Sequence, residues 1–169
     1  MNKIKQLALL ILVTGFSLKS YSQATATATA TATVVTPITI SKTADLSFGN
    51  IAVQAATGGT VVLAPAGTRT STSGVTLPAT TGTVTAATFQ VDGTGSYTYA
   101  ITLPATATLT RASGSETMTA GTFTSNPSGT GALSSGTQNI SVGATLTVAA
   151  GQVPGVYTSG NFSVTVNYN

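Results

Sequence analysis

Residues 96–103 read Ser-Tyr-Thr-Tyr-Ala-Ile-Thr-Leu, and this stretch decides the fold class. Its larger apolar side chains stand at every second position: Tyr97, Tyr99, Ile101 and Leu103. Successive side chains of a β-strand point to opposite faces of a sheet. The spacing therefore predicts a strand with one buried face and one solvated face.

Other segments of the chain repeat this alternation. At the C-terminal end, residues 161–168 place four apolar side chains on one face: Phe162, Val164, Val166 and Tyr168. Weaker strands are expected at residues 37–42, 46–53, 60–64, 83–91, 117–123 and 139–148. Between Ala86 and Phe89 the alternation slips by one residue, which predicts a bulge or a bend. Glycine- and proline-rich turns separate the segments, so we expect an all-β antiparallel sandwich of about eight strands, with residues 124–136 as a long exposed loop.

The N-terminus has the pattern of an export signal. Lys3 and Lys5 precede an apolar run over residues 7–13, and small residues lead to Gln23. The run is shorter than the roughly 20 residues that span a bilayer, so we expect a signal peptide over residues 1–22 and no membrane span after its removal. The predicted organisation is then an Ala/Thr extension at 23–36 and one sandwich domain at 37–169, in a secreted protein of the extracellular space, the cell surface or the periplasm.

The inventory of ionisable residues excludes most enzyme chemistry. The chain has six Lys and Arg, three Asp and Glu, no His and no Cys. After loss of residues 1–22, three positive charges balance three negative ones: Lys42, Arg69 and Arg111 against Asp45, Asp92 and Glu116. This set cannot form a His-dependent triad, a His or Cys metal centre, or the basic surface that nucleic acid requires. We expect no enzyme, no catalytic, cofactor-binding or metal-binding residue, no cofactor and no nucleic-acid partner.

The remaining candidate sites also have simpler interpretations. The three acidic residues are scattered next to turns, where carboxylates are usually solvated. The stretch from Asp92 to Ser96 offers one carboxylate to a cation and is better explained as a hairpin turn. Lys42 near Asn167 or Asn169 could in principle form an amide crosslink. Threonines at a spacing of two are the kind of array that binds ice, but regular repetition over several strands is missing from the sequence; they occur within 24–33, 106–110, 122–124 and 145–147.

The segment before the sandwich is five consecutive Ala-Thr pairs, residues 24–33, followed by Val34 and Val35. One interpretation is a flexible linker of low complexity. The other is a strand that has no partner in its own chain, since a period of two fits a strand and ten residues at about 3.3 Å each span roughly 33 Å. The candidate donor-strand residues are Ala24, Ala26, Ala28, Ala30, Ala32, Val34 and Val35.

The C-terminal end of the chain has a distinctive pattern. Gly155 stands fourteen residues before Asn169, an alternating apolar strand follows, and Tyr168 is penultimate. Together with the alternating N-terminal segment, this pattern resembles the fimbrial subunits of the chaperone-usher pathway. Leu46-Ser47-Phe48-Gly49 and Phe89-Gln90-Val91-Asp92-Gly93 also resemble segments of the archaic, spore-coat-protein-U-like subunits. This resemblance implies an immunoglobulin-like sandwich completed by a strand from another subunit, a periplasmic chaperone, and an assembly strand at the C-terminus that contains Gly155, Phe162, Val164, Val166 and Tyr168.

Three elements spread over most of the chain are Leu-Ser-Phe-Gly, Tyr-x-Ile-x-Leu-Pro and a C-terminal Val-Thr-Val-x-Tyr. They resemble a family of secreted bacterial domains of unknown function, family 4402. We expect a non-catalytic structural or cell-surface protein. Its finer form is a pilin-like subunit that assembles with copies of itself by donor-strand complementation. The alternative is a monomeric extracellular adhesin or ligand-binding module for carbohydrate, a surface or ice.

Overall fold

The computed structural model describes residues 21–169. The expected signal peptide falls largely on residues 1–20, outside this range. Residues 35–169 form one compact unit, and the residues before Val35 belong to another. No helix in the described part of the chain is long and apolar enough to cross a membrane.

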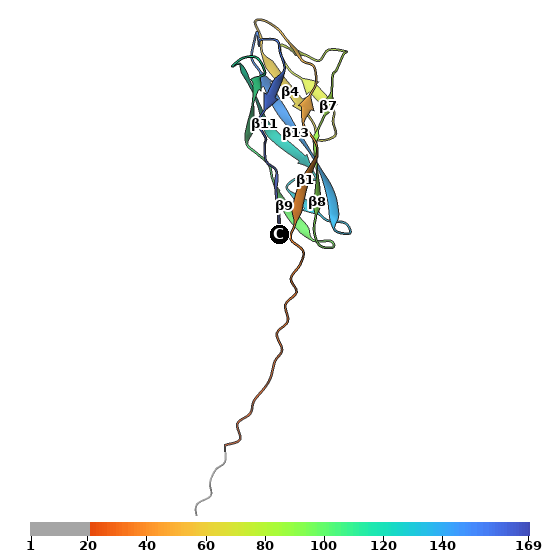
Figure 1. The fold of residues 1–169 in the computed structure, drawn as a ribbon, viewed down its shortest axis with the longest axis vertical. Helices are drawn as coiled ribbons and strands as arrows, with labels where there is room; N and C mark the ends of the chain where they lie inside the picture. The colour runs from red at the N-terminus through yellow and green to blue at the C-terminus, as the bar shows by residue number, and fades with distance from the viewer. Residues whose placement is uncertain (1–20) are drawn as a thin grey trace, which may run out of the picture. The chain divides into compact units, whose positions relative to one another are not determined.

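The folded unit is built of antiparallel strands, as the alternation predicts (Figure 1). In the described residues the strands are β1 (Thr39–Ala44), β2 (Ser47–Phe48), β3 (Ala52–Val53), β4 (Gly59–Leu63), β5 (Arg69–Ser71), β6 (Val75–Thr76), β7 (Val84–Thr85), β8 (Ala87–Asp92), β9 (Thr98–Thr102), β10 (Thr106–Arg111), β11 (Thr117–Asn126), β12 (Thr130–Ala132), β13 (Thr137–Val148), β14 (Tyr157–Ser159) and β15 (Thr165–Tyr168).

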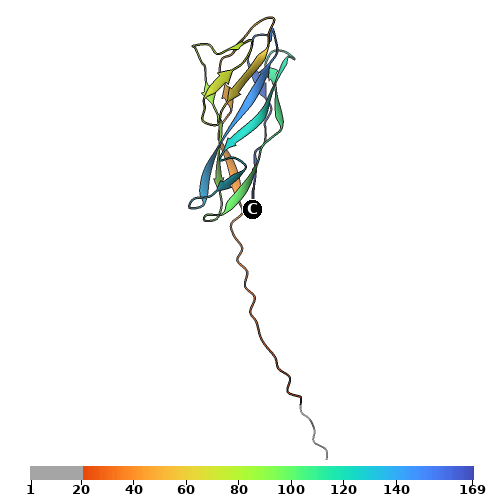
Figure 2. The same ribbon diagram turned by 180° about the vertical axis from the view of Figure 1, so that it is seen from behind.

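The main sheet is organised around β13, its longest strand. On one side β13 pairs with β8 and then with β4, and on the other it pairs with β11. The strand order is β1-β8-β13-β11-β10-β14, with β4 also paired to β13 and β5 paired to β4. Three smaller sheets, β12-β9-β15, β2-β7 and β3-β6, complete the fold. In Figures 1 and 2, β1, β8 and β9 lie at the end of the unit that holds the C-terminus, and β4 lies at the other end.

Two clusters of buried side chains form the core. The first lies around Tyr99, Ile140 and Val91 and is covered by Val164 and Val166. The second lies around Val61, Leu63 and Leu146, toward the opposite end. Tyr99 is fully buried, and its hydroxyl donates to the side-chain oxygen of Gln138 at 2.7 Å, which satisfies the polar atom in the core. Burial raises the pKa of this phenol.

Several expectations from the sequence need correction. Residues 124–136 are not one exposed loop, because they contain the end of β11, all of β12 and the buried Leu133. The C-terminal strand is interrupted, since only β14 and β15 are strands and residues 160–164 between them are not. The strands are also more numerous than the eight expected, as residues 46–53 divide into β2 and β3, whereas β11 and β13 are longer than expected. The slip near Ala86 is confirmed as a break between β7 and β8, where Ala86 and Ala87 are both buried.

Candidate functional site

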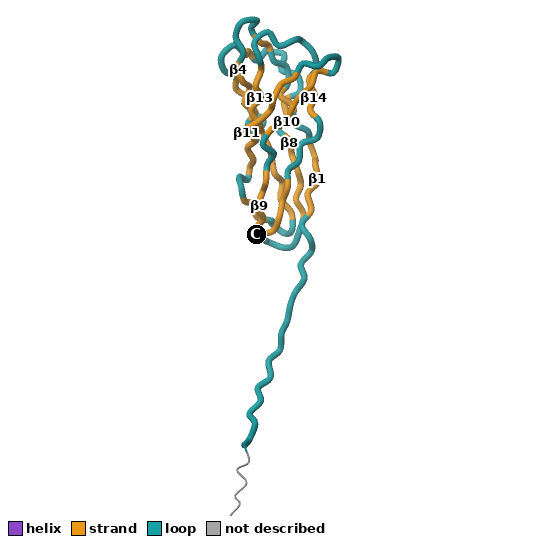
Figure 3. The backbone as a smooth tube through the Cα atoms, turned by 90° about the vertical axis from the view of Figure 1, so that its left-hand side faces the viewer, coloured by secondary structure: helices purple, strands orange, loops and turns teal. Residues whose placement is uncertain are grey.

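An open groove of about 1230 Å³ runs along the sandwich beside the second core cluster. One wall is formed by residues 42–53, which include β2 and β3. The opposite wall is formed by residues 152–162, which include β14. Figure 3 shows β14 next to β10, the strand with which it pairs. The groove therefore separates an early segment of the chain from a late one.

The floor of the groove is apolar. It is formed mainly by side chains of the main sheet and of the two walls: Phe48, Phe89, Leu109, Met118, Phe123, Leu146, Val148 and Phe162. Leu109, Met118 and Phe123 are only partly buried, although they pack against the second core cluster. In the first cluster, Val166 of β15 and Val164 just before this strand provide the cover. The corresponding segment over the second cluster, Tyr157–Ser159, has no large aliphatic side chain, so this part of the core stays open.

Both walls are the edges of sheets. Within the described residues, β14 pairs only with β10, β2 only with β7, and β3 only with β6. Each of these strands therefore has a second side without a strand partner, and such an edge presents backbone N–H and C=O groups to any strand laid beside it. At one end the walls are joined, because Gly151 donates its backbone N–H to the carbonyl of Gln54 at 3.0 Å.

Arg69 holds the first wall in place. Its guanidinium donates to the carbonyl oxygens of Phe48 and Asn50, and more weakly to that of Thr81 at 3.4 Å. Gly49 lies between the first two acceptors with a φ of 69°, and a Cβ there would lie 2.3 Å from the carbonyl oxygen of Thr81. The Arg69 side chain thus fixes the turn that contains Gly49, and Arg69 itself is not among the residues that line the groove.

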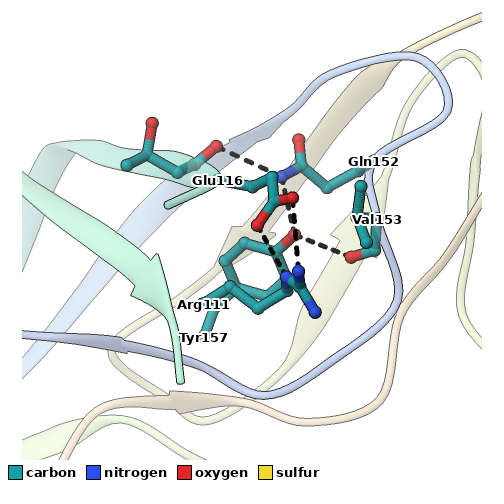
Figure 4. A network of polar contacts seen from close by, with 6 residues as sticks. Arg111, Glu116, Gln152, Val153 and Tyr157 are labelled. Atoms are coloured by element: carbon teal, nitrogen blue, oxygen red, sulfur yellow. Dashed lines mark hydrogen bonds and ion pairs between the residues drawn. The ribbon is translucent and has the colours of Figure 1, made fainter. Parts of the chain in front are cut away.

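A second arginine organises the opposite wall (Figure 4). Arg111 binds both carboxylate oxygens of Glu116, with its closer nitrogen at 2.7 Å, and this contact lowers the pKa of Glu116. The neighbouring Tyr157 hydroxyl accepts from the amide of Gln152 at 2.9 Å and donates to the carbonyl of Val153 at 2.7 Å. These bonds tie Tyr157 of β14 to the loop that precedes it. The Gln152 amide also donates to the carbonyl of Thr117, which connects this loop to β11.

The predicted C-terminal assembly residues are divided between the groove and the core. Phe162 lines the groove, and its ring lies 5.2 Å from that of Phe123. Gly155 lies on the groove wall with a φ of 155°, where a Cβ would meet the side chain of Arg111. Val164 and Val166 are buried in the first core cluster, and Tyr168 packs against it.

The predicted donor residues lie in a segment without secondary structure. Ala24, Ala26, Ala28, Ala30, Ala32 and Val34 are exposed, and Val34 is 96% exposed. Val35, which belongs to the folded unit, is partly buried. The sequence did not identify the first wall or Arg69 as parts of a site. The Leu46-Ser47-Phe48-Gly49 motif lies in this wall, but it indicated only a family resemblance, and an isolated arginine belongs to no motif.

The structure gives each acidic residue a different partner. Asp45 pairs with Lys42 at 2.6 Å, Asp92 accepts from the amide of Gln90, and Glu116 binds Arg111. The carboxylates therefore do not form a pair, and Lys42 has a nearer partner than Asn167 or Asn169. In the described residues, no group of three or more acidic, His or Cys side chains could hold a metal ion.

The fold and the groove define a class: an all-β sandwich whose core is open along one pair of edges. A family model, Domain of unknown function (DUF4402), matches residues 38–168. The chain belongs to this family. No curated protein and no solved structure matches it.

Proposed function

We propose that the protein is a non-catalytic subunit of a secreted or cell-surface assembly, in which the groove of one copy receives residues 24–35 of another copy as a strand. The observation that supports this best is the apolar floor between two unpaired strand edges. A strand laid in the groove would cover the partly exposed Leu109, Met118 and Phe123 and would satisfy the free edges. Pilin-like assembly by donor-strand complementation follows the same physical logic.

The donor segment is long enough to form a full edge strand. The groove walls belong to residues 42–53 and 152–162, and the candidate donor extends over residues 24–35. In extended conformation, at about 3.3 Å per residue, the donor would span roughly 40 Å.

The alternation of the donor determines which side chains face the floor. In a strand, Ala24, Ala26, Ala28, Ala30, Ala32 and Val34 share one face, and the threonines share the other. The floor is already occupied by large side chains such as Phe48, Phe123 and Phe162. A donor with a methyl group at alternate positions suits such a floor, whereas the threonine face can remain in water.

An unfilled groove would be a liability before assembly, because free strand edges beside an apolar floor promote nonspecific pairing. We therefore propose a periplasmic chaperone that occupies the groove until a second copy replaces it. A monomeric adhesin or binding module, whose groove takes an external ligand, is the other candidate function that the open groove supports.

One pair of variants tests the donor strand. Ala28→Asp should place a carboxylate over the apolar floor at a cost of about 3 kcal/mol, which is roughly a hundredfold in affinity. Thr29→Asp, on the opposite face, is the matched control and should assemble normally. The measurement is the mass of the purified mature protein by size-exclusion chromatography with light scattering, before and after strong denaturation.

The result expected for the wild type is a series of high-mass species that fall to monomer only on denaturation. Loss of this series in Ala28→Asp and its retention in Thr29→Asp would support the proposal. A wild-type monomer, or equal assembly of both variants, would contradict it. A monomer would give the binding-module function priority.

A further inference from the structure

The solvent face of the main sheet carries an array of threonines. Thr108 of β10, Thr119 of β11, Thr147 of β13 and Thr60 of β4 stand directly opposite one another across four strands. On either side of this row, further threonines occupy the same face in alternate positions. We define the threonine face as Thr60, Thr70, Thr106, Thr108, Thr110, Thr117, Thr119, Thr145, Thr147 and Thr158. The regular repetition over several strands that the sequence did not reveal is therefore present in the structure, because it arises from pairing between distant segments.

The threonine face is also free of charge. Among the charged side chains of residues 21–169, Asp92 also lies on the solvent face of the main sheet, but on β8 opposite Thr137 and outside the threonine face, and it accepts from Gln90. The other charged side chains make contacts away from this face: Lys42 with Asp45, Arg111 with Glu116, and Arg69 with backbone carbonyls. Solvated sheet faces of soluble proteins usually carry charges of both signs, and these charges oppose association between copies. The threonine face has no charges that would oppose such association.

The chemistry of the face limits what can bind it. Nucleic acid requires cations, which the face lacks. Its largest apolar residue is Val62, 39% exposed, and none of the residues that define it is aromatic, so it offers no ring to stack on a sugar. A rigid ice lattice requires a flat array, but neighbouring strands rotate by about 20–25°, which accumulates to roughly 60–75° over the four strands of the central row.

A second copy of the same face meets these conditions. In a twofold interface each patch faces itself, so any charge near the axis would face a like charge, and this face has none. Two sheets of the same twist pack face to face with their strands about 30° apart, so the twist that prevents a lattice match suits this partner. Methyl groups can pack between the sheets while the hydroxyls bond across them.

We propose that the protein associates with a second copy through the threonine face, separately from the strand exchange at the groove. Six strands spaced about 4.8 Å apart, each contributing one to three threonines, make a patch of roughly 300 Å² per copy. A patch of this size gives weak, reversible pairing between single copies. In an assembly that displays many copies in a row, the same contact acts repeatedly and joins assemblies side by side.

The test uses the full mature chain with strand exchange blocked by Ala28→Asp, studied by sedimentation equilibrium over a wide concentration range. We expect reversible, concentration-dependent pairing. Adding Thr119→Lys, at the centre of the face, should weaken it about tenfold or more, because two lysines then face each other. Thr102→Lys, at an exposed position on β9 in the other layer, is the matched control and should leave it unchanged.

Mixing two variants of opposite charge gives the decisive experiment. An equimolar mixture of Thr119→Lys and Thr119→Glu chains should recover pairing, as mixed dimers in which opposite charges meet. The proposal is overturned by a parent chain that stays monomeric throughout, by equal effects of Thr119→Lys and Thr102→Lys, or by a mixture that does not recover. It is also overturned if the monomer inhibits ice growth and Thr119→Lys abolishes only that property.

These outcomes are separate from those of the proposed function. If Ala28→Asp and the unaltered chain form the same denaturation-sensitive high-mass series, strand exchange by residues 24–35 is wrong. The reversible component measured with Thr119→Lys still decides the threonine face.

Discussion

Two glycines with positive φ separate the cost of backbone strain from the cost of a steric clash. Gly49 has a φ of 69°, and a Cβ there would lie 2.3 Å from the carbonyl oxygen of Thr81. Gly67 has a φ of 82°, and no atom lies within 4 Å of its hypothetical Cβ. Gly67→Ala should destabilise by about 1–2 kcal/mol through the left-handed backbone alone.

Gly49→Ala should cost more, about 3 kcal/mol or above, since the wall must also move. Urea unfolding of both variants, followed by circular dichroism, measures the difference. Equal losses would show that the turn at Gly49 relaxes freely and that Arg69 does not hold it tightly.

At the level of an element, the β10–β11 hairpin makes stability depend on pH. Arg111 lowers the pKa of Glu116 below its ordinary value of 4.5. The folded chain therefore binds this proton less readily than the unfolded chain does, and the ion pair stabilises the fold above pH 4.5. The contribution is lost as the pH falls from 4.5 through the lowered pKa of the folded state.

The expected result is a urea midpoint that decreases over this acidic range in the wild type and decreases less in Glu116→Gln. Arg111→Gln, which removes the cause of the lowered pKa, should show the same flatter profile. If both variants keep the full wild-type acid dependence, other carboxylates account for it and the ion pair contributes nothing measurable.

The sequence predicted elements well where one strand alone carries the signal. Residues 96–103 and 139–148 alternate clearly, and they correspond to β9 and β13. It failed where the structure depends on pairing. β12 is a short strand in a Ser- and Gly-rich stretch, and it forms because Gly131 pairs with Tyr99. The first groove wall is likewise two short segments fixed by Arg69 from a distant part of the chain, which no local pattern could reveal.

At the scale of the whole molecule, the proposed donor and the proposed acceptor come from different parts of the chain. The candidate donor, residues 24–35, precedes β1, and the groove combines residues 42–53 with residues 152–162. A sequence can indicate the donor from its alternation, but the acceptor exists only when both ends of the folded unit come together. The sequence therefore indicated the donor and, through Gly155 and Phe162, part of one groove wall, but it missed the wall formed by residues 42–53.

The absence of cysteine from the sequence allows a direct test of where the donor lies. Ala107 lines the groove and is partly exposed, so a chain with Ala107→Cys and Ala28→Cys should form disulfides between copies under mild oxidation. Moving the donor cysteine along Ala24, Ala26, Ala30 and Ala32 should give a maximum in yield at one position, because a disulfide requires Cα atoms about 4.4–6.8 Å apart.

Thr29→Cys with Ala107→Cys is the control, since its side chain would face away from the floor. Non-reducing electrophoresis should show a ladder for the best alanine position and little for Thr29. A yield that is the same at every position, including Thr29, would mean that the segment meets the groove only by random encounter. A sharp maximum would fix the register of the donor strand, and from it the side chain that covers Leu109 and Met118.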